Sequence, residues 1–212
     1  RSVGVAIGTL VALGSGPVFA GLLAALLLKE RPKRAWIVAT VVCLVGLGLL
    51  TAGGGRHGHV PIGGLLLVVA SGLGYAAYTV GAKRLMSAGH DSSTVMAATF
   101  AIGGVALLPV LLTQPMGWLT SGRGLALAFY LGLATITVAY VLFGRGLSKM
   151  GAGPVTTLAL TEPLVATILG VTVLDERLGV AGVAGALLVL GGVLLQGVVS
   201  TRRTPLVEPF AA

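Results

Sequence analysis

The sequence predicts an all-α integral membrane protein with seven transmembrane helices, the C-terminal part of a ten-helix, 5+5 inverted-repeat bundle. Only 9% of the 212 residues are charged, against about 25% in an average globular chain, and the mean hydropathy is +1.02. Long charge-free stretches alternate with short charged segments. A pair of these apolar segments also recurs 146 residues further along the chain. Composition, charge spacing and repetition therefore agree on a membrane bundle.

The composition excludes several classes of protein. A soluble globule of this size needs many more polar residues to cover its core, so the lipid bilayer must cover this one. The formal charge of +8 comes from basic residues clustered between apolar segments, which is typical of membrane loops rather than of a nucleic-acid surface. The single cysteine, Cys43, lies in an apolar segment and cannot form an internal disulfide, so we expect its side chain to pack between helices.

Each charge-free stretch holds one membrane span, because a helix that crosses the hydrocarbon needs about 20 mostly apolar residues. The first stretch has 27 residues between Arg1 and Lys29, and the last has 24 residues between Arg177 and Arg202. The other stretches are of similar length, and one is interrupted only by Glu162. The predicted helices cover residues 5–28, 34–52, 61–86, 92–113, 122–147, 151–174 and 178–199.

Basic residues predict the orientation of these spans. The loops on one side carry ten Lys and Arg, and those on the other side carry four, namely Arg1, Arg56, Arg123 and Arg177. Cytoplasmic loops are the basic ones, so the C-terminus is predicted in the cytoplasm and Arg1 outside. The protein is thus expected to be a multi-pass protein of the cell membrane.

The internal repeat relates the first two spans to the last two. At an offset of 146 residues, 11 of the 44 residues from 6 to 49 are identical, including Pro17 with Pro163 and Glu30-Arg31 with Glu176-Arg177. We call two residues 146 positions apart repeat mates. The copies lie five helices apart, and an odd spacing inverts the second copy. Inverted repeats are typical of secondary transporters, and five helices per copy would place three further spans before Arg1.

At these residues the chain resembles the EamA-type carriers of the drug/metabolite transporter superfamily. The pattern of a mid-helix Pro, an apolar stretch, a Glu-Arg turn and a Gly-bearing helix occurs from Pro17 to Gly46 and again from Pro163 to Gly192. The start of a second repeat is similar too, from Gly64 through Tyr75-Ala76-Ala77-Tyr78-Thr79 to Lys83-Arg84. The resemblance implies ten helices in two inverted halves, a central cavity, and export or exchange of amino acids, amines or related metabolites, often proton-coupled. It also implies that this chain lacks the first three helices.

The resemblance and the spans together predict the domain organisation. Residues 1–52 would be the last two helices of the first EamA repeat and residues 53–60, which are rich in glycine, a linker loop. Residues 61–200 would be the five-helix second repeat, and residues 201–212 a cytoplasmic tail.

Glu162 is the strongest candidate for a substrate-binding or proton-coupling residue. It is the only acidic residue inside a predicted span, and an ionised carboxylate there is costly unless it is paired or hydrated, so we expect it to face the bundle interior. Pro163 follows it and removes a backbone donor, which loosens the helix at that point. Pro17 repeats the kink without the charge. The alternative is a protonated Glu162 that only bonds a neighbouring helix.

Four further polar residues are weaker candidates for the same site. Tyr75 and Tyr78 lie three residues apart on one helix, where Tyr140 from another span could face them, and Thr161 precedes Glu162. Aromatic rings with a polar tip are ordinary at helix interfaces, so packing is the favoured interpretation of the tyrosines. A hydroxyl such as that of Thr161 often bonds back to its own helix.

The remaining sequence patterns say less about function. His57 and His59 suggest a metal pair, but the loop supplies no third ligand, and no constellation of an enzyme appears, so neither metal, cofactor nor catalysis is expected. Trp36 and Trp118 near span ends are expected at the membrane interface.

A small-molecule metabolite and the bilayer are the expected partners, and a homodimer is left open. The competing interpretations are a seven-helix receptor or photoreceptor, which lacks a Lys in 178–199 for a Schiff base, and a noncatalytic membrane scaffold.

Overall fold

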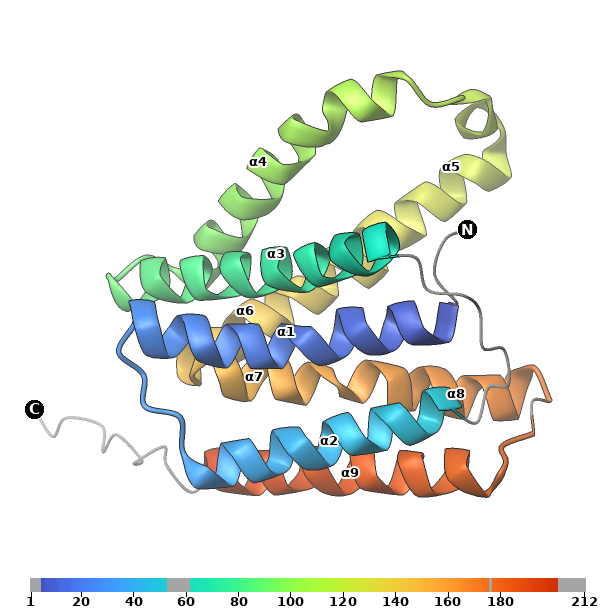
Figure 1. Cartoon of the computed structure of the whole chain (residues 1–212). Helices are drawn as coiled ribbons and strands as arrows, with labels where there is room; N and C mark the ends of the chain where they lie inside the picture. Colours follow the sequence, from blue (N-terminus) through green and yellow to red (C-terminus); the bar gives the residue numbers. More distant parts are fainter. Residues whose placement is uncertain (1–4, 53–61, 176, 202–212) are drawn as a thin grey trace, which may run out of the picture. The chain divides into compact units, whose positions relative to one another are not determined.

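The computed structural model describes residues 5–52, 62–175 and 177–201, and no strand occurs among them (Figure 1). Contacts divide the chain into two units, Arg1–Val80 with Met150–Ala212 as unit 1 and Gly81–Lys149 as unit 2. The elements are α1 (Val5–Leu27), α2 (Arg34–Ala52), α3 (Ile62–Ser87), α4 (Ser92–Leu112), η1 (Gly117–Thr120), α5 (Gly122–Phe129), η2 (Tyr130–Val138), α6 (Ala139–Lys149), α7 (Ala152–Ala159), α8 (Thr161–Val173) and α9 (Val180–Thr201).

Six helices in the described part of the chain are long and apolar enough to cross a membrane. They are α2, α3 from Gly63, α4, the continuous run Gly122–Lys149, the pair α7–α8, and α9. In the first predicted span only the shorter apolar segment Val11–Leu27 is found, so the count of seven is not confirmed. The predicted linker 53–60 and nearly all of the predicted tail lie outside the described residues.

The core of unit 1 is the antiparallel pair α2 and α9, which lie side by side (Figure 1). A Cβ on Gly46 would lie 2.7 Å from the Gly185 carbonyl oxygen and 2.7 Å from the Val189 backbone nitrogen. A Cβ on Gly192 would lie 2.9 Å from the Ala39 carbonyl oxygen and 3.1 Å from the Cys43 nitrogen. Both glycines therefore let backbone meet backbone, which is how small residues stabilise helix pairs in lipid.

The helix that carries Glu162 is broken one residue before α8. Leu160, between α7 and α8, has ψ near −1°, and its N–H bonds the Thr157 carbonyl in a tighter turn at 3.1 Å. Pro163 explains the break, because it supplies no N–H to the carbonyl four residues earlier and its ring crowds that carbonyl. Its repeat mate Pro17 lies inside an uninterrupted α1, so the two copies do not share the break.

Unit 2 is built on the packing of α4 against α6. A Cβ on Gly144 would lie 2.7 Å from Met96 Cγ, and Leu147 is fully buried. Asp91 caps α4 by accepting from the Thr94 backbone N–H at 3.0 Å, which lowers the pKa of its exposed carboxyl. Between α5 and α6 the chain widens into the π-helix η2.

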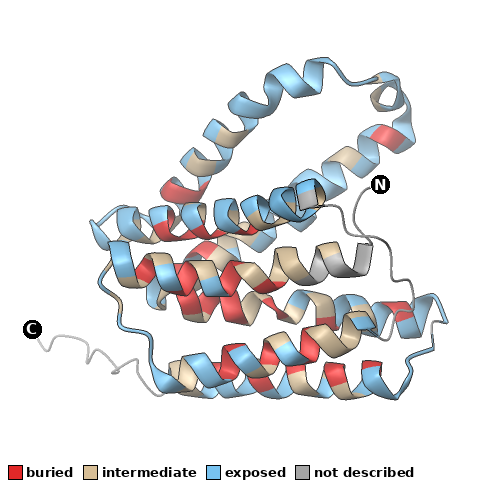
Figure 2. Ribbon diagram, viewed as in Figure 1, coloured by how far each residue is buried: buried red, intermediate tan, exposed pale blue. Residues whose placement is uncertain are grey.

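The exposed surface of the described helices is largely apolar. Buried residues gather where α1, α2, α7 and α9 of unit 1 face one another, and exposed residues predominate along α4 and α5 (Figure 2). Large side chains with more than 60% exposure include Leu66, Leu67, Ile102, Leu112 and Val173. Monomeric soluble proteins rarely expose such continuous apolar faces, so the chain is a multi-pass membrane protein.

Candidate functional site

Glu162 lies in the first turn of α8, directly after the break at Leu160, and its side chain is exposed. The expectation that other helices of this chain enclose it is therefore not met in the described residues. The break still places a carboxylate beside a stretch of backbone whose regular hydrogen bonds are interrupted, near the middle of the α7–α8 span. An acidic side chain within an apolar span remains the feature that most needs a polar partner.

The repeat mate of Glu162 is Gly16, which lies at a close crossing of α1 and α3. A Cβ on Gly16 would lie 3.1 Å from Cδ1 of Tyr75, so the tyrosine ring rests on the backbone of α1. The hydroxyl of Ser15, the repeat mate of Thr161, fills the space beside Gly72 on α3. The same place in the two copies thus carries a tight helix crossing in one and an exposed carboxylate in the other.

Tyr75 and Tyr78 are brought together, as their spacing predicts. Their rings make an edge-to-face contact with centroids 5.4 Å apart, and both side chains are half-buried. Thr79 is fully buried on the same helix and bonds back to the Tyr75 carbonyl at 2.8 Å. Tyr75 thereby stands between Tyr78 and the α1 backbone at Gly16.

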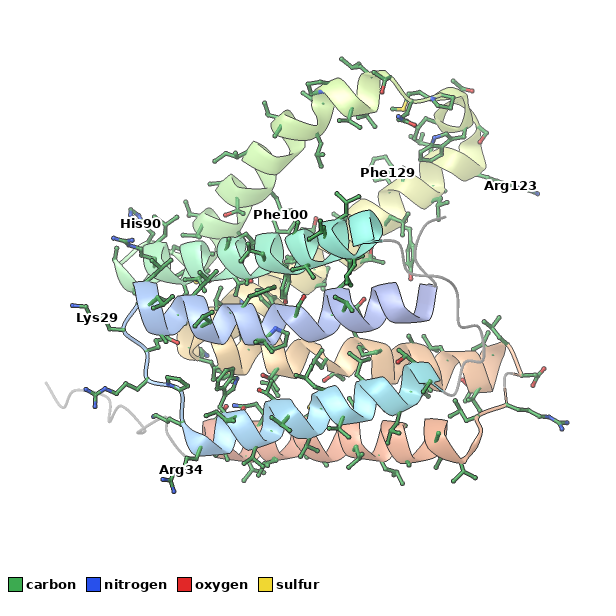
Figure 3. All side chains as sticks on the ribbon, viewed as in Figure 1. Lys29, Arg34, His90, Phe100, Arg123 and Phe129 are labelled. Carbon is green, nitrogen blue, oxygen red and sulfur yellow. The ribbon has the colours of Figure 1, made fainter. Side chains whose placement is uncertain are left out.

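Tyr140 belongs to unit 2 and has other aromatic neighbours. Its ring lies 4.4 Å from that of Phe100 on α4 and 5.9 Å from that of Phe143 on α6, measured between centroids. Phe100 is labelled on α4 in Figure 3. A meeting of Tyr140 with Tyr75 and Tyr78 stays a prediction. Within unit 2 the tyrosine completes a cluster of three rings, which favours packing.

Thr156 and Thr161 bond the backbone of their own helical segment. Thr156 donates to the Gly153 carbonyl at 2.8 Å, and Thr161 donates to the Leu158 carbonyl at 2.7 Å. Back-bonding of this kind satisfies a hydroxyl in lipid without a ligand. It also supplies a partner for a carbonyl close to the break before α8.

Trp36 forms an interhelical cluster that the sequence did not predict. Its indole lies at Gly21 of α1 and at Gly153 of α7, where a Cβ on Gly153 would be 3.0 Å from the ring. The indole Nε1 donates to Thr157 Oγ1 at 3.0 Å, and this hydroxyl lies 2.8 Å from Thr40 Oγ1. Trp36 therefore points into unit 1, and its expected position at the membrane interface stays a prediction.

Glu30 makes a second long-range contact at the same end of unit 1. Its Oε2 accepts from the Ala152 backbone N–H at 3.3 Å, and Gly151, which precedes α7, offers no capping side chain. A carboxylate at a helix N-terminus satisfies a free donor and interacts favourably with the helix dipole. Figure 3 shows Lys29 and Arg34 flanking the segment that carries Glu30.

The described residues contain no group of three His, Cys, Asp or Glu suited to a metal ion. His57 and His59, the pair suggested by the sequence, lie outside the described residues.

Comparison with known proteins identifies the family of this arrangement. The EamA-like transporter family matches residues 62–197. The transporter YwfM of Bacillus subtilis is 35% identical over 205 residues, which cover 96% of this chain and 69% of that protein. A probable terminal-alkyne amino-acid exporter of Streptantibioticus cattleyicolor is 28% identical over 84% of this chain and 60% of its own length.

A solved crystal structure has the same fold, with a TM-score of 0.77 at 22% sequence identity. The match covers 96% of this chain and 70% of the other. The chain thus spans between 60% and 70% of the length of these three proteins.

Proposed function

The chain belongs to the EamA-like transporter family, and from that premise we propose that it is the larger part of a secondary transporter that exports or exchanges small metabolites by alternating access. Relatives named as transporters favour this over an enzyme. Its two inverted copies would open in turn to opposite sides of the membrane.

The contacts between α2 and α9 are the observation that carries the proposal. Gly46 and Gly192 are repeat mates, and so are the residues they touch, because Ala39 corresponds to Gly185 and Cys43 to Val189. Cys43 Sγ even lies 3.7 Å from the carbonyl oxygen of its own mate, Val189. Reciprocal contacts between mates on antiparallel helices are what a local twofold axis in the membrane plane would produce. This symmetry supports the inverted repeat.

Glu162 is the proposed coupling residue, with Pro163 as the source of local backbone freedom. The break at Leu160 leaves carbonyl groups near the carboxylate with fewer helical partners. A cation or proton exchanged there would find a negative charge beside the Ala159 carbonyl, to which Pro163 can donate no N–H. Thr161, Tyr75, Tyr78, Tyr140 and Pro17 complete the proposed site as weaker members.

The substrate class is proposed to be amino acids or related amines. The relative from Streptantibioticus cattleyicolor, whose name states amino-acid export, supports this class. A carboxylate that pairs with an ammonium group is chemically suited to it. The C-terminus is proposed to lie in the cytoplasm, since α9 ends beside the basic start of α2 in the antiparallel pair.

Glu162→Gln tests the proposal in proteoliposomes of the full-length protein. The variant keeps the size of the side chain and one oxygen acceptor but neither titrates nor carries charge. We expect proton-driven flux of radiolabelled amino acids to be lost in Glu162→Gln. Asp175→Asn is the matched control, because Asp175 is an exposed acid just past the end of α8 and should leave the flux unchanged.

Two outcomes would contradict parts of the proposal. Equal flux for Glu162→Gln and the parent protein at every pH would remove the coupling role. An absence of flux for any amino acid or amine in the parent protein would favour the noncatalytic scaffold instead.

A further inference from the structure

Three helix ends meet around Trp36 in unit 1. The indole touches α1 at Gly21 and α7 at Gly153, while Trp36 itself belongs to the first turn of α2. Neither glycine could carry a side chain without displacing the ring. The indole therefore fills the space between α1 and α7 close to one end of the unit.

Polar contacts tie the same three segments. Trp36 Nε1 donates to Thr157, whose hydroxyl lies 2.8 Å from that of Thr40 and also bonds the Gly153 carbonyl at 3.1 Å. Both threonines are buried, so water does not compete for these groups. Glu30, in the loop after α1, adds its contact with the start of α7. All four contacts involve α7, at Ala152, Gly153 and Thr157.

The repeat mates of the residues in this cluster cannot form the same contacts. The repeat mates of Trp36, Thr40 and Thr157 are Gly182, Ala186 and Val11. None of these side chains has a hydrogen-bonding group or a ring. The local symmetry that relates α2 to α9 is therefore broken in one chemical respect, since the repeat mates of the cluster lack its polar side chains.

We propose that Trp36 is the gate residue at this end of unit 1. Its hydrogen bond to Thr157 holds α1, α2 and α7 together and so keeps a substrate path between these helices closed. The inference rests on the proposed alternating access, which requires the helices at one end to separate while those at the other stay together. Separation of α7 from α2 here must break the bond from Trp36 to Thr157 and withdraw the ring from between Gly21 and Gly153. Because the repeat mates Gly182, Ala186 and Val11 cannot form the same hydrogen bonds, the two closed states differ in the contacts that hold them.

A reversible crosslink tests whether α2 and α7 separate during transport. Thr40→Cys and Thr157→Cys would be combined with Cys43→Ala, which removes the native cysteine of this chain. The hydroxyl oxygens of the two residues lie 2.8 Å apart, so the side chains point toward each other as a disulfide requires. We expect oxidation to abolish amino-acid flux in proteoliposomes and dithiothreitol to restore it. Oxidation should leave the flux of each single-cysteine variant at the level that the same variant shows when reduced.

A second pair of variants isolates the hydrogen bond. Trp36→Phe keeps an aromatic ring but loses the donor, and Trp118→Phe is the matched control because Trp118 is exposed in unit 2. The readout is alkylation of the buried Thr156→Cys in the Cys43→Ala background. Loss of one hydrogen bond should raise the labelling rate roughly two- to tenfold for Trp36→Phe and leave it unchanged for Trp118→Phe.

The outcomes separate the gate from the proposed function. Full flux through a completely crosslinked protein, or unchanged labelling in Trp36→Phe, would overturn the gate while leaving transport intact. A reduced protein and a parent protein that both fail to transport would instead overturn the proposed function.

Discussion

Lys29 and Asp175 are repeat mates and adopt nearly the same left-handed backbone, with φ of 56° and 54°. Among the described residues they are the non-glycine positions with positive φ. Each follows a helix whose last turn is closed by the same bond, from Leu28 N to the Ala24 carbonyl and from Leu174 N to the Gly170 carbonyl. The two helices therefore end in one backbone motif, although one copy presents a base and the other an acid.

Glycine at either of these positions should stabilise the protein. A left-handed residue with a Cβ is strained by about 1 kcal/mol, which glycine relieves. We expect Lys29→Gly and Asp175→Gly each to raise the free energy of unfolding by roughly 0.5–1 kcal/mol, measured by denaturant titration in detergent. Lys149→Gly, within the last turn of α6, is the control and should lower it. Destabilisation by Lys29→Gly would show that its side chain matters more than its backbone.

Alanine at Gly46 or Gly192 should separate α2 from α9. The new methyl group would press on backbone atoms 2.7–3.1 Å away, which cannot yield as a flexible side chain would. We expect each substitution to cost about 1–3 kcal/mol. Gly191→Ala, with nothing within 4 Å, is the neighbouring control and should leave thermal unfolding unchanged. Equal melting temperatures for all three variants would contradict the close packing.

Lys83 should contribute to the stability of unit 2 through two backbone carbonyls at the end of α6. Its Nζ donates to Leu147 O at 2.8 Å and to Ser148 O at 3.1 Å, where a positive charge also suits the helix dipole. After allowance for its partial exposure, Lys83→Met should cost about 1 kcal/mol. Arg84→Met alters the adjacent, exposed base and should cost much less. The comparison requires only unfolding curves of the two variants.

Tyr75 should act mainly through its ring. The ring lies on Gly16 and against Tyr78, and phenylalanine keeps both contacts. We therefore expect near-parental amino-acid flux in Tyr75→Phe and Tyr78→Phe, and a loss of roughly 3 kcal/mol of stability in Tyr75→Ala. A large fall in flux for either phenylalanine variant, with its melting temperature unchanged, would assign the hydroxyl a role in substrate binding.

The helix boundaries illustrate what sequence alone could predict. The predicted spans 34–52 and 92–113 differ from α2 and α4 by at most one residue, because charged and loop-forming residues bracket each apolar stretch. Trp36 shows the opposite case. Proximity to a span end suggested the membrane interface, and nothing local could reveal that Gly21 and Gly153, far away in the chain, leave room for an indole.

The sequence by itself determined that this chain is helical and crosses a membrane, and its repeat resembles those of carriers. Charge spacing and composition can be interpreted locally, and a segment in lipid must hydrogen-bond its own backbone groups, which a helix does. Tertiary structure decided which residues meet: the reciprocal contacts of Gly46 and Gly192, the exposure of Glu162 and the cluster around Trp36. Such contacts depend on distances between helices, which in an apolar chain are set by the fit of small and large side chains across an interface, and no single stretch of sequence contains that information.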